Sequence, residues 1–140
     1  MIYKIFFSVS FIMCILLSSC DKKLSKDEII KQFKENEDIY NIASQTNNYT
    51  KIKKLRGVKD VYKSNDYVRI IYETKGLVSG GSTYGIYYSD DDSLCAIDLS
   101  PSCEELKQEG NGYRYKQKNG DNEYYVEKIG NHYYYFEAHF

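Results

Sequence analysis

The chain has 140 residues, 42% of them hydrophobic, and a formal net charge of -1 at pH 7. This length is sufficient for one domain with a substantial core. The near balance of charge argues against a general nucleic-acid-binding protein.

The first 19 residues have the three parts of an export signal. Lys4 supplies positive charge, residues 5–17 are mainly apolar, and two serines follow. As a helix, residues 5–17 would rise only about 20 Å, which is short of a hydrocarbon core of about 30 Å. The charged Asp21-Lys22-Lys23 prevents the run from extending. The sequence predicts a signal peptide over residues 1–19 rather than a membrane-spanning anchor.

The segment Leu17-Ser18-Ser19-Cys20 resembles the lipobox of bacterial lipoprotein precursors. The resemblance implies cleavage before Cys20 and acylation of that cysteine with palmitate-type chains, each buried methylene contributing about 0.8 kcal/mol. Residues 20–24 would form the lipidated cysteine and a short tether, and residues 25–140 a single extracytoplasmic domain on the cell membrane. The alternative is an ordinary cleaved signal in which Cys20 is incidental.

Four cysteines occur in the chain, and the lipoprotein interpretation assigns two of them. Cys14 leaves with the signal peptide and Cys20 is modified, so Cys95 and Cys103 remain. A location outside the reducing cytoplasm favours a disulfide between them. A pair of free thiols is the alternative, and zinc is disfavoured because no histidine lies nearby.

After the tether, Ser25-Lys26-Asp27-Glu28 fits a capping box, which marks the start of a helix. Apolar side chains then recur at near-helical spacing. We expect one helix over residues 26–45, closed by Asn47 and Asn48 and packed on the core through Ile29, Ile30, Phe33, Tyr40 and Ala43.

Charge is unevenly distributed along the chain. Residues 50–63 hold six basic side chains against only Asp60, whereas residues 90–109 are acidic. In a tethered protein the basic stretch could contact anionic lipid headgroups or an acidic wall polymer. The alternative is a solvated strand face and turn.

Residues beyond Thr50 read as strands and turns, because alternating apolar runs are separated by glycine, asparagine and aspartate clusters. In the second run Val68 and Ile70 alternate with Arg69, although Ile71 interrupts the polar side. A short helix is expected from Ser102 to Gly110. The predicted strands cover residues 58–63, 67–74, 83–89, 113–118, 123–129 and 132–139.

This order of elements predicts an α+β fold. An N-terminal helix packs on a mostly antiparallel meander sheet of about five to six strands. The order also resembles cystatin-like and nuclear-transport-factor-like domains, in which a curved sheet cradles a helix, but such a likeness implies no function.

The final hairpin contains the densest aromatic block, and its register determines what each tyrosine faces. A two-residue loop would set Val126 opposite Tyr135, and a three-residue loop would set it opposite Tyr134. We favour the second register, because it places the apolar side chains of both strands on the same face of the hairpin. That face consists of Tyr124, Val126, Tyr134, Phe136 and Ala138.

The opposite face of this hairpin is the candidate binding surface, since tyrosine offers broad contact area at low conformational cost. The alternative is that this face is covered. The expected partner is a protein or a cell-wall component, in an immunity, inhibitor or envelope accessory role. The candidate binding residues are Tyr125, Tyr133, Tyr135, Glu137 and His139.

Catalytic signals are weak. The sequence has no phosphate-binding glycine loop, nucleophile elbow or zinc helix, so we expect a protein that is not an enzyme and needs no cofactor. The alternative is a small extracytoplasmic hydrolase that uses His139 and Glu137, and a further alternative is a structural lipoprotein without a specific ligand.

Overall fold

The computed structural model describes residues 23–76 and 80–140. The expected signal peptide, the lipidation of Cys20 and the first part of the tether lie outside the described residues. Within the described ranges, no helix combines the length and apolar character needed to cross a bilayer.

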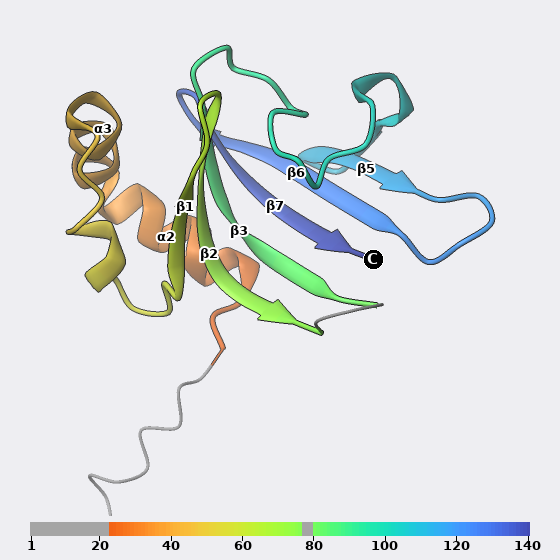
Figure 1. The fold of residues 1–140 in the computed structure, drawn as a ribbon, viewed down its shortest axis with the longest axis horizontal. Coiled ribbons are helices and arrows are strands. Elements are labelled where there is room, and N and C mark those ends of the chain that lie inside the picture. The colour runs from red at the N-terminus through yellow and green to blue at the C-terminus, as the bar shows by residue number, and fades with distance from the viewer. Residues whose placement is uncertain (1–22, 77–79) are drawn as a thin grey trace, which may run out of the picture.

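The expected α+β class is confirmed, with seven strands rather than five to six (Figure 1). In chain order the helical elements are α2 (Lys26–Glu35), α3 (Glu37–Thr46), η1 (Ile52–Lys54) and η2 (Cys103–Glu105). The strands are β1 (Asp60–Lys63), β2 (Tyr67–Lys75), β3 (Ser82–Ser89), β4 (Lys107–Glu109), β5 (Gly112–Lys116), β6 (Glu123–Gly130) and β7 (Tyr133–His139).

The predicted capping box is present at the start of α2. The Ser25 hydroxyl accepts from the Glu28 backbone amide at 3.3 Å, and the Glu28 carboxylate accepts from the Ser25 amide at 2.8 Å. The expected single helix is divided at Asn36, whose side-chain amide donates to the Gln32 carbonyl at 2.8 Å. Asparagine competes in this way for helical backbone groups. Asn47, in the left-handed conformation, ends α3.

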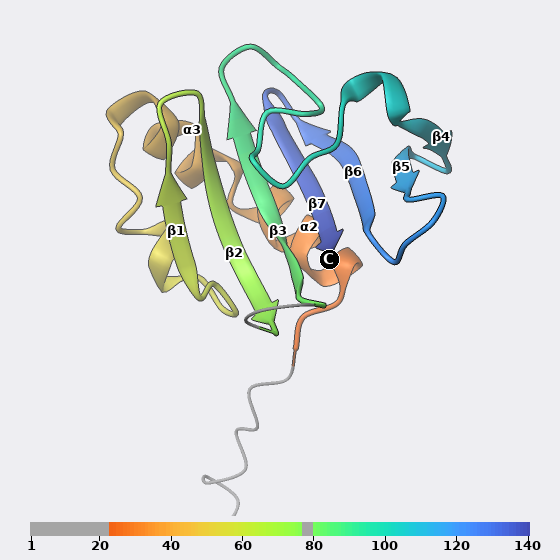
Figure 2. The same ribbon diagram turned by 45° about the vertical axis from the view of Figure 1, so that its right-hand side comes forward.

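All strand pairs are antiparallel, and their order is β1-β2-β3-β7-β6-β5-β4. β3 therefore pairs with the last strand, so two meanders are joined side by side. The acidic stretch carries the chain from β3 to the far edge, where β4 begins, as the two ribbon views show (Figures 1 and 2). η2 and β4 replace the short helix expected up to Gly110.

Both faces of the sheet carry a hydrophobic core. Helices α2 and α3 cover one face, which we call the helix face (Figure 1). The acidic excursion, residues 90–106, covers much of the other, which we call the excursion face, and Ile97 is buried there. The predicted disulfide between Cys95 and Cys103 is present in the excursion, with a Cα–Cα distance of 5.7 Å.

The last hairpin has the predicted facial division but not the predicted register. Gly130 pairs with Tyr133, so the turn is Asn131-His132, one residue later than expected, and a bulge between Lys128 and Gly130 then sets Val126 opposite Phe136. Both registers considered from the sequence are therefore wrong. The apolar set predicted for one side lies in the core of the excursion face, and Tyr125, Tyr133 and Tyr135 lie on the helix face.

Candidate functional site

The tyrosines expected on an exposed surface are buried. Tyr125, Tyr133 and Tyr135 are 5%, 1% and 2% exposed, because α2 and α3 cover the helix face. The Tyr133 hydroxyl donates to the Tyr40 carbonyl at 2.6 Å. The expectation of an exposed tyrosine stripe is wrong, because these three side chains pack in the hydrophobic core.

The other two predicted binding residues, Glu137 and His139, lie at the end of β7. The Tyr135 hydroxyl donates to the Glu137 carboxylate at 2.7 Å. His139 Nδ1 and Ser82 Oγ share a hydrogen bond of 2.7 Å. The structure thus gives each of the two side chains a separate neighbour, and the Ser82–His139 pair is a contact that the sequence did not predict.

On the helix face, carboxylates and tyrosines alternate across four strands. The register sets Glu73 beside Tyr84, Tyr84 beside Glu137, and Glu137 beside Tyr125. Lys23 lies 4.6 Å from the centre of the Tyr84 ring and 2.8 Å from the Glu73 carboxylate. The beginning of the described chain is therefore held on this row.

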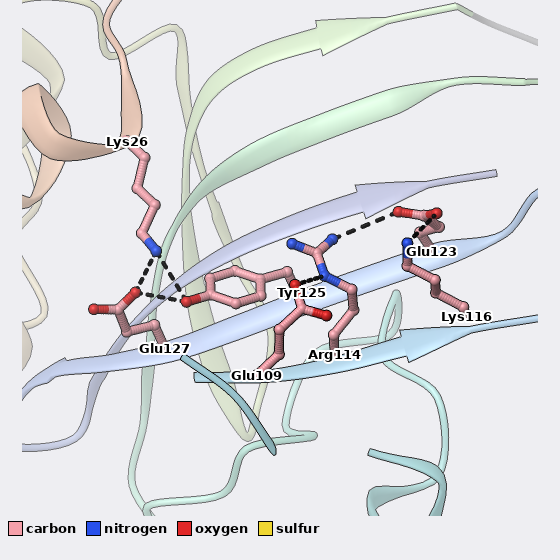
Figure 3. A network of polar contacts seen from close by, with 7 residues as sticks. All are labelled: Lys26, Glu109, Arg114, Lys116, Glu123, Tyr125 and Glu127. Carbon is pink, nitrogen blue, oxygen red and sulfur yellow. Dashed lines mark hydrogen bonds and ion pairs between the residues drawn. The ribbon is translucent and has the colours of Figure 1, made fainter. Parts of the chain in front are cut away.

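Tyr125 is the centre of a charged network that joins α2 to the sheet (Figure 3). Its hydroxyl accepts from Lys26 at 2.9 Å and donates to Glu127 at 2.7 Å, while Lys26 and Glu127 form an ion pair. The Arg114 guanidinium lies 4.9 Å from the ring centre and bonds Glu109 at 2.6 Å. Figure 3 shows every charged group facing a partner of opposite charge.

The pKa of Glu127 reflects this network. Burial tends to raise the pKa, but the hydrogen bonds from Lys26 and Tyr125 outweigh it, so the pKa lies below its ordinary value. The pKa of Lys26 is raised, since the hydrogen bonds to Glu127 and Tyr125 outweigh the effect of burial. Because both charges are satisfied internally, the network acts as a structural clamp on α2.

An open groove lies at the border between the excursion and the edge strand β1. Its volume is about 800 Å³. Arg69, Ile71 and Thr83 come from the excursion face of the sheet, and Leu99 comes from the excursion beside them. We call this the Arg69 groove.

Arg69 is held in place from two sides. Its Nη1 donates to the Asp98 carboxylate at 2.8 Å, and the guanidinium lies 5.0 Å from the centre of the Tyr62 ring. The side chain is only 15% exposed. Its Nε is buried and has no hydrogen-bond partner among the described residues. Because this atom has almost no exposed surface, a ligand in the groove could reach only the terminal nitrogens of the guanidinium.

Exposed aromatic side chains stand at the groove. Tyr62 is 46% exposed and Phe140 is 40% exposed. They are two of the four large hydrophobic side chains that are exposed in the described part of the chain, the others being Ile42 and Tyr113. Apolar surface beside a half-buried cation is typical of a site for a partner that carries both kinds of group.

Basic groups also line the Arg69 groove. Lys59 and Lys75 join Arg69, with Asp60 and Glu73 as the acidic lining residues. The Glu73 carboxylate is bound by Lys23 and also lies 3.5 Å from Lys75. Because Asp98 pairs with Arg69 and Glu73 with Lys75, the charges at the groove nearly balance, and a carboxylate-bearing ligand would be recognised through the Arg69 guanidinium.

Sequence reasoning missed Arg69, Tyr62 and Phe140 as a site, although one signal was present. Ile71 interrupts the polar side of β2, which indicates that this side is partly buried. An arginine two residues away on the same side is then half-buried as well. The closeness of Phe140 depends on the β3–β7 pairing, and no local pattern reveals that pairing.

Comparison with known protein families, curated proteins and solved structures finds no significant match to this chain. The likeness to cystatin-like and nuclear-transport-factor-like domains therefore stays a prediction from element order. In the described ranges, no three side chains of His, Cys, Asp or Glu converge as a metal site requires.

Proposed function

We propose that this chain is an extracytoplasmic lipoprotein, anchored to the cell membrane through Cys20, whose domain binds a partner in the Arg69 groove. The anchor is supported by the lipobox-like segment. A disulfide in the excursion is consistent with a compartment outside the reducing cytoplasm.

The observation that carries the binding proposal is the state of Arg69. An arginine that lies in the wall of the groove and is fixed by Asp98 and Tyr62 is already oriented for an acceptor at its terminal nitrogens. Pre-orientation lowers the conformational cost of binding. A carboxylate is an acceptor that arginine binds strongly, and hydrogen bonds to charged groups contribute about 1.5–3 kcal/mol.

The partner is a polypeptide segment that presents an aspartate or glutamate next to an apolar side chain. The carboxylate would reach Arg69, while the apolar neighbour would contact Tyr62, Leu99 or Phe140. Such a partner suits inhibition, immunity or an accessory role in an envelope complex. Contact is thereby assigned to the Arg69 groove in place of the buried tyrosines.

The test is a selection of random displayed peptides on the acylated full chain. We expect the enriched peptides to carry Asp or Glu beside an aliphatic or aromatic residue. Their affinity for Arg69→Gln should be at least about tenfold weaker, the equivalent of one charged hydrogen bond. Tyr62→Ser should also weaken binding.

Arg56→Gln is the matched control, since Arg56 is 71% exposed in its side chain, pairs with Glu28 of α2 and does not line the groove. It should bind the peptides as the wild type does. Equal affinity for wild type and Arg69→Gln would contradict the groove proposal. Failure to enrich any peptide would instead favour a structural lipoprotein without a specific ligand.

One contact favours a second candidate function, a small hydrolase. The hydrogen bond between Ser82 and His139 pairs a hydroxyl with an imidazole, as nucleophilic catalysis requires. If the chain hydrolyses a wall or lipid ester substrate, His139→Ala and Ser82→Ala should both abolish turnover, and Glu137→Ala should reduce it. Binding in the Arg69 groove predicts no such loss.

A further inference from the structure

We infer that one end of the domain lies flat on anionic lipid headgroups, through a basic segment placed beside the membrane tether. The basic segment is residues 51–59, with Lys51, Lys53, Lys54, Arg56 and Lys59 and no acidic residue. This inference rests on the proposed acylation of Cys20 and adds to it an orientation and a lipid preference.

The basic segment packs against the first residues of the described chain. Gly57 has a φ of +81°, and a Cβ there would lie 2.7 Å from the Leu24 side chain. Leu24 itself is only 5% exposed. On the same side Arg56 pairs with Glu28 at 3.4 Å. η1 and the loop after it lie at the end of the domain where the described chain begins (Figures 1 and 2).

The tether leaves little freedom at this end. Cys20 precedes Lys23 by three residues, which span at most about 11 Å when fully extended. Lys23 is held on the sheet by Glu73 and by the Tyr84 ring. An acylated Cys20 therefore keeps Lys23 within about 11 Å of the membrane surface, a distance comparable to the Debye length of roughly 8 Å at physiological salt.

Three lysines of the basic segment are available for such a surface. Ile52 is fully buried and fixes the segment, whereas Lys51, Lys53 and Lys54 are exposed. Within the described part of the chain, these three lysines make no ion pair or hydrogen bond through their side chains. Each lysine close to an anionic membrane raises the affinity for that membrane by about fivefold.

The test measures how fast a water-soluble reagent acetylates each lysine, by mass spectrometry of the acylated full chain in vesicles. Vesicles of phosphatidylcholine alone are compared with vesicles that also contain phosphatidylglycerol. We expect acetylation of Lys51, Lys53 and Lys54 to slow by at least about fivefold on the anionic vesicles. The effect should vanish near 1 M salt, where the Debye length is about 3 Å.

Lys63 and Lys107 are internal controls, because both are exposed and lie away from the tethered end. Their acetylation should be the same on both kinds of vesicle. Equal slowing on neutral and anionic vesicles would overturn the inference, since the tether alone would explain it. If soluble polyphosphate slowed the acetylation of these lysines and vesicles did not, the lipid inference would also be overturned, and an acidic wall polymer would be favoured as the partner.

The same digest separates this inference from the proposed anchor. An acylated Cys20 peptide with no difference among the lysines would leave the anchor standing and remove the lipid contact. An unmodified Cys20 peptide, in a chain that does not float with vesicles, would overturn both.

Discussion

The Tyr133 hydroxyl donates to the Tyr40 carbonyl at 2.6 Å, in the interior between helices and sheet. The rings of Phe33 and Tyr40 lie 5.1 Å and 5.7 Å from that of Tyr133. Buried tyrosines of this kind contribute area, ring contacts and a satisfied hydroxyl at once.

Truncation of Tyr133 should therefore unfold the protein readily. We expect Tyr133→Ala to lower the free energy of unfolding by about 3–5 kcal/mol, as for other large buried aromatics. Tyr133→Phe should cost about 1–2 kcal/mol because the Tyr40 carbonyl loses its donor. The matched control is Tyr113→Ala, at a side chain 37% exposed, which should cost less than about 1 kcal/mol. Similar losses for Tyr133→Ala and Tyr113→Ala, measured by urea unfolding, would contradict the burial of Tyr133.

The Glu127 clamp predicts a pH dependence. The pKa of Glu127 is lowered in the folded state, so the unfolded state binds the proton first as the pH falls. The stabilisation is present above the ordinary glutamate pKa of about 4.3 and is lost as the pH falls through the lower folded value. Thermal melts should therefore show a smaller fall in Tm with acidification for Glu127→Gln than for wild type.

Glu104→Gln provides the control, because Glu104 is exposed and no hydrogen bond or ion pair of its carboxylate occurs among the described residues. Its Tm should follow the wild-type pH curve. Parallel curves for Glu127→Gln and wild type would show that the Lys26–Glu127 clamp contributes nothing to stability.

Residue patterns predicted the direction of side chains correctly more often than they predicted whether those side chains are exposed. Alternation assigned Tyr125, Tyr133 and Tyr135 to one face correctly, because the two-residue period of a strand is local. It could not show that the helices cover that face, since the path of α3 depends on the break at Asn36. Arg69 was placed on the polar side, but its neighbours Asp98 and Tyr62 come from distant segments.

At the scale of elements, a bulge in β2 places Tyr72 as an extra residue between two registers, with Ile71 opposite Gly85 and Glu73 opposite Tyr84. A Cβ at Gly85 would lie 2.0 Å from the Ile70 carbonyl oxygen. Glycine is therefore required on β3 at this point, and it allows the two backbones to approach closely.

Gly85→Ala should cost about 3 kcal/mol or more, since the new methyl group meets backbone that cannot move aside. Gly110→Ala is the control: its φ is +60°, but no atom lies within 4 Å of the new Cβ. We expect about 1 kcal/mol there from backbone conformation alone. Chemical unfolding of both variants gives the comparison, and equal costs would contradict the close β2–β3 approach.

The disulfide belongs to the excursion and closes a short loop. Cys95 and Cys103 are eight residues apart, for which chain entropy predicts about 2.5 kcal/mol of stabilisation. Addition of reductant should lower the urea midpoint by the corresponding amount. The double variant Cys95→Ser with Cys103→Ser should have the lower urea midpoint from the start, and reductant should not change it. A wild-type midpoint that does not change with reductant would contradict the disulfide.

Elements with local signals were predictable from the sequence, and those with distant causes were not. The capping box at Ser25 marks the start of a helix and the hairpin glycines mark turns, and each of these signals lies within a few residues of sequence. The register of β6 with β7 failed because the turn lies at Asn131-His132, one residue beyond the expected Gly130-Asn131, and because the bulge at Lys128–Gly130 shifts the pairing again. β4 was missed because its three residues become a strand only through pairing with β5.

The whole molecule combines a sheet covered on both faces, a groove at one border and, as proposed, a short lipid tether. Lys59 and Lys75 line the Arg69 groove and also lie toward the tethered end of the domain. If that end rests on lipid, a partner in the groove is held close to the bilayer. Such a partner would itself be a membrane or surface protein.

The proposed anchor on Cys20 underlies the compartment, the orientation and the partner class together. The intact mass of the protein isolated from its host tests it most directly. We predict a polypeptide that begins at Cys20 and carries the added mass of acyl chains on that residue. A mass equal to the unmodified chain from Met1 would contradict the account.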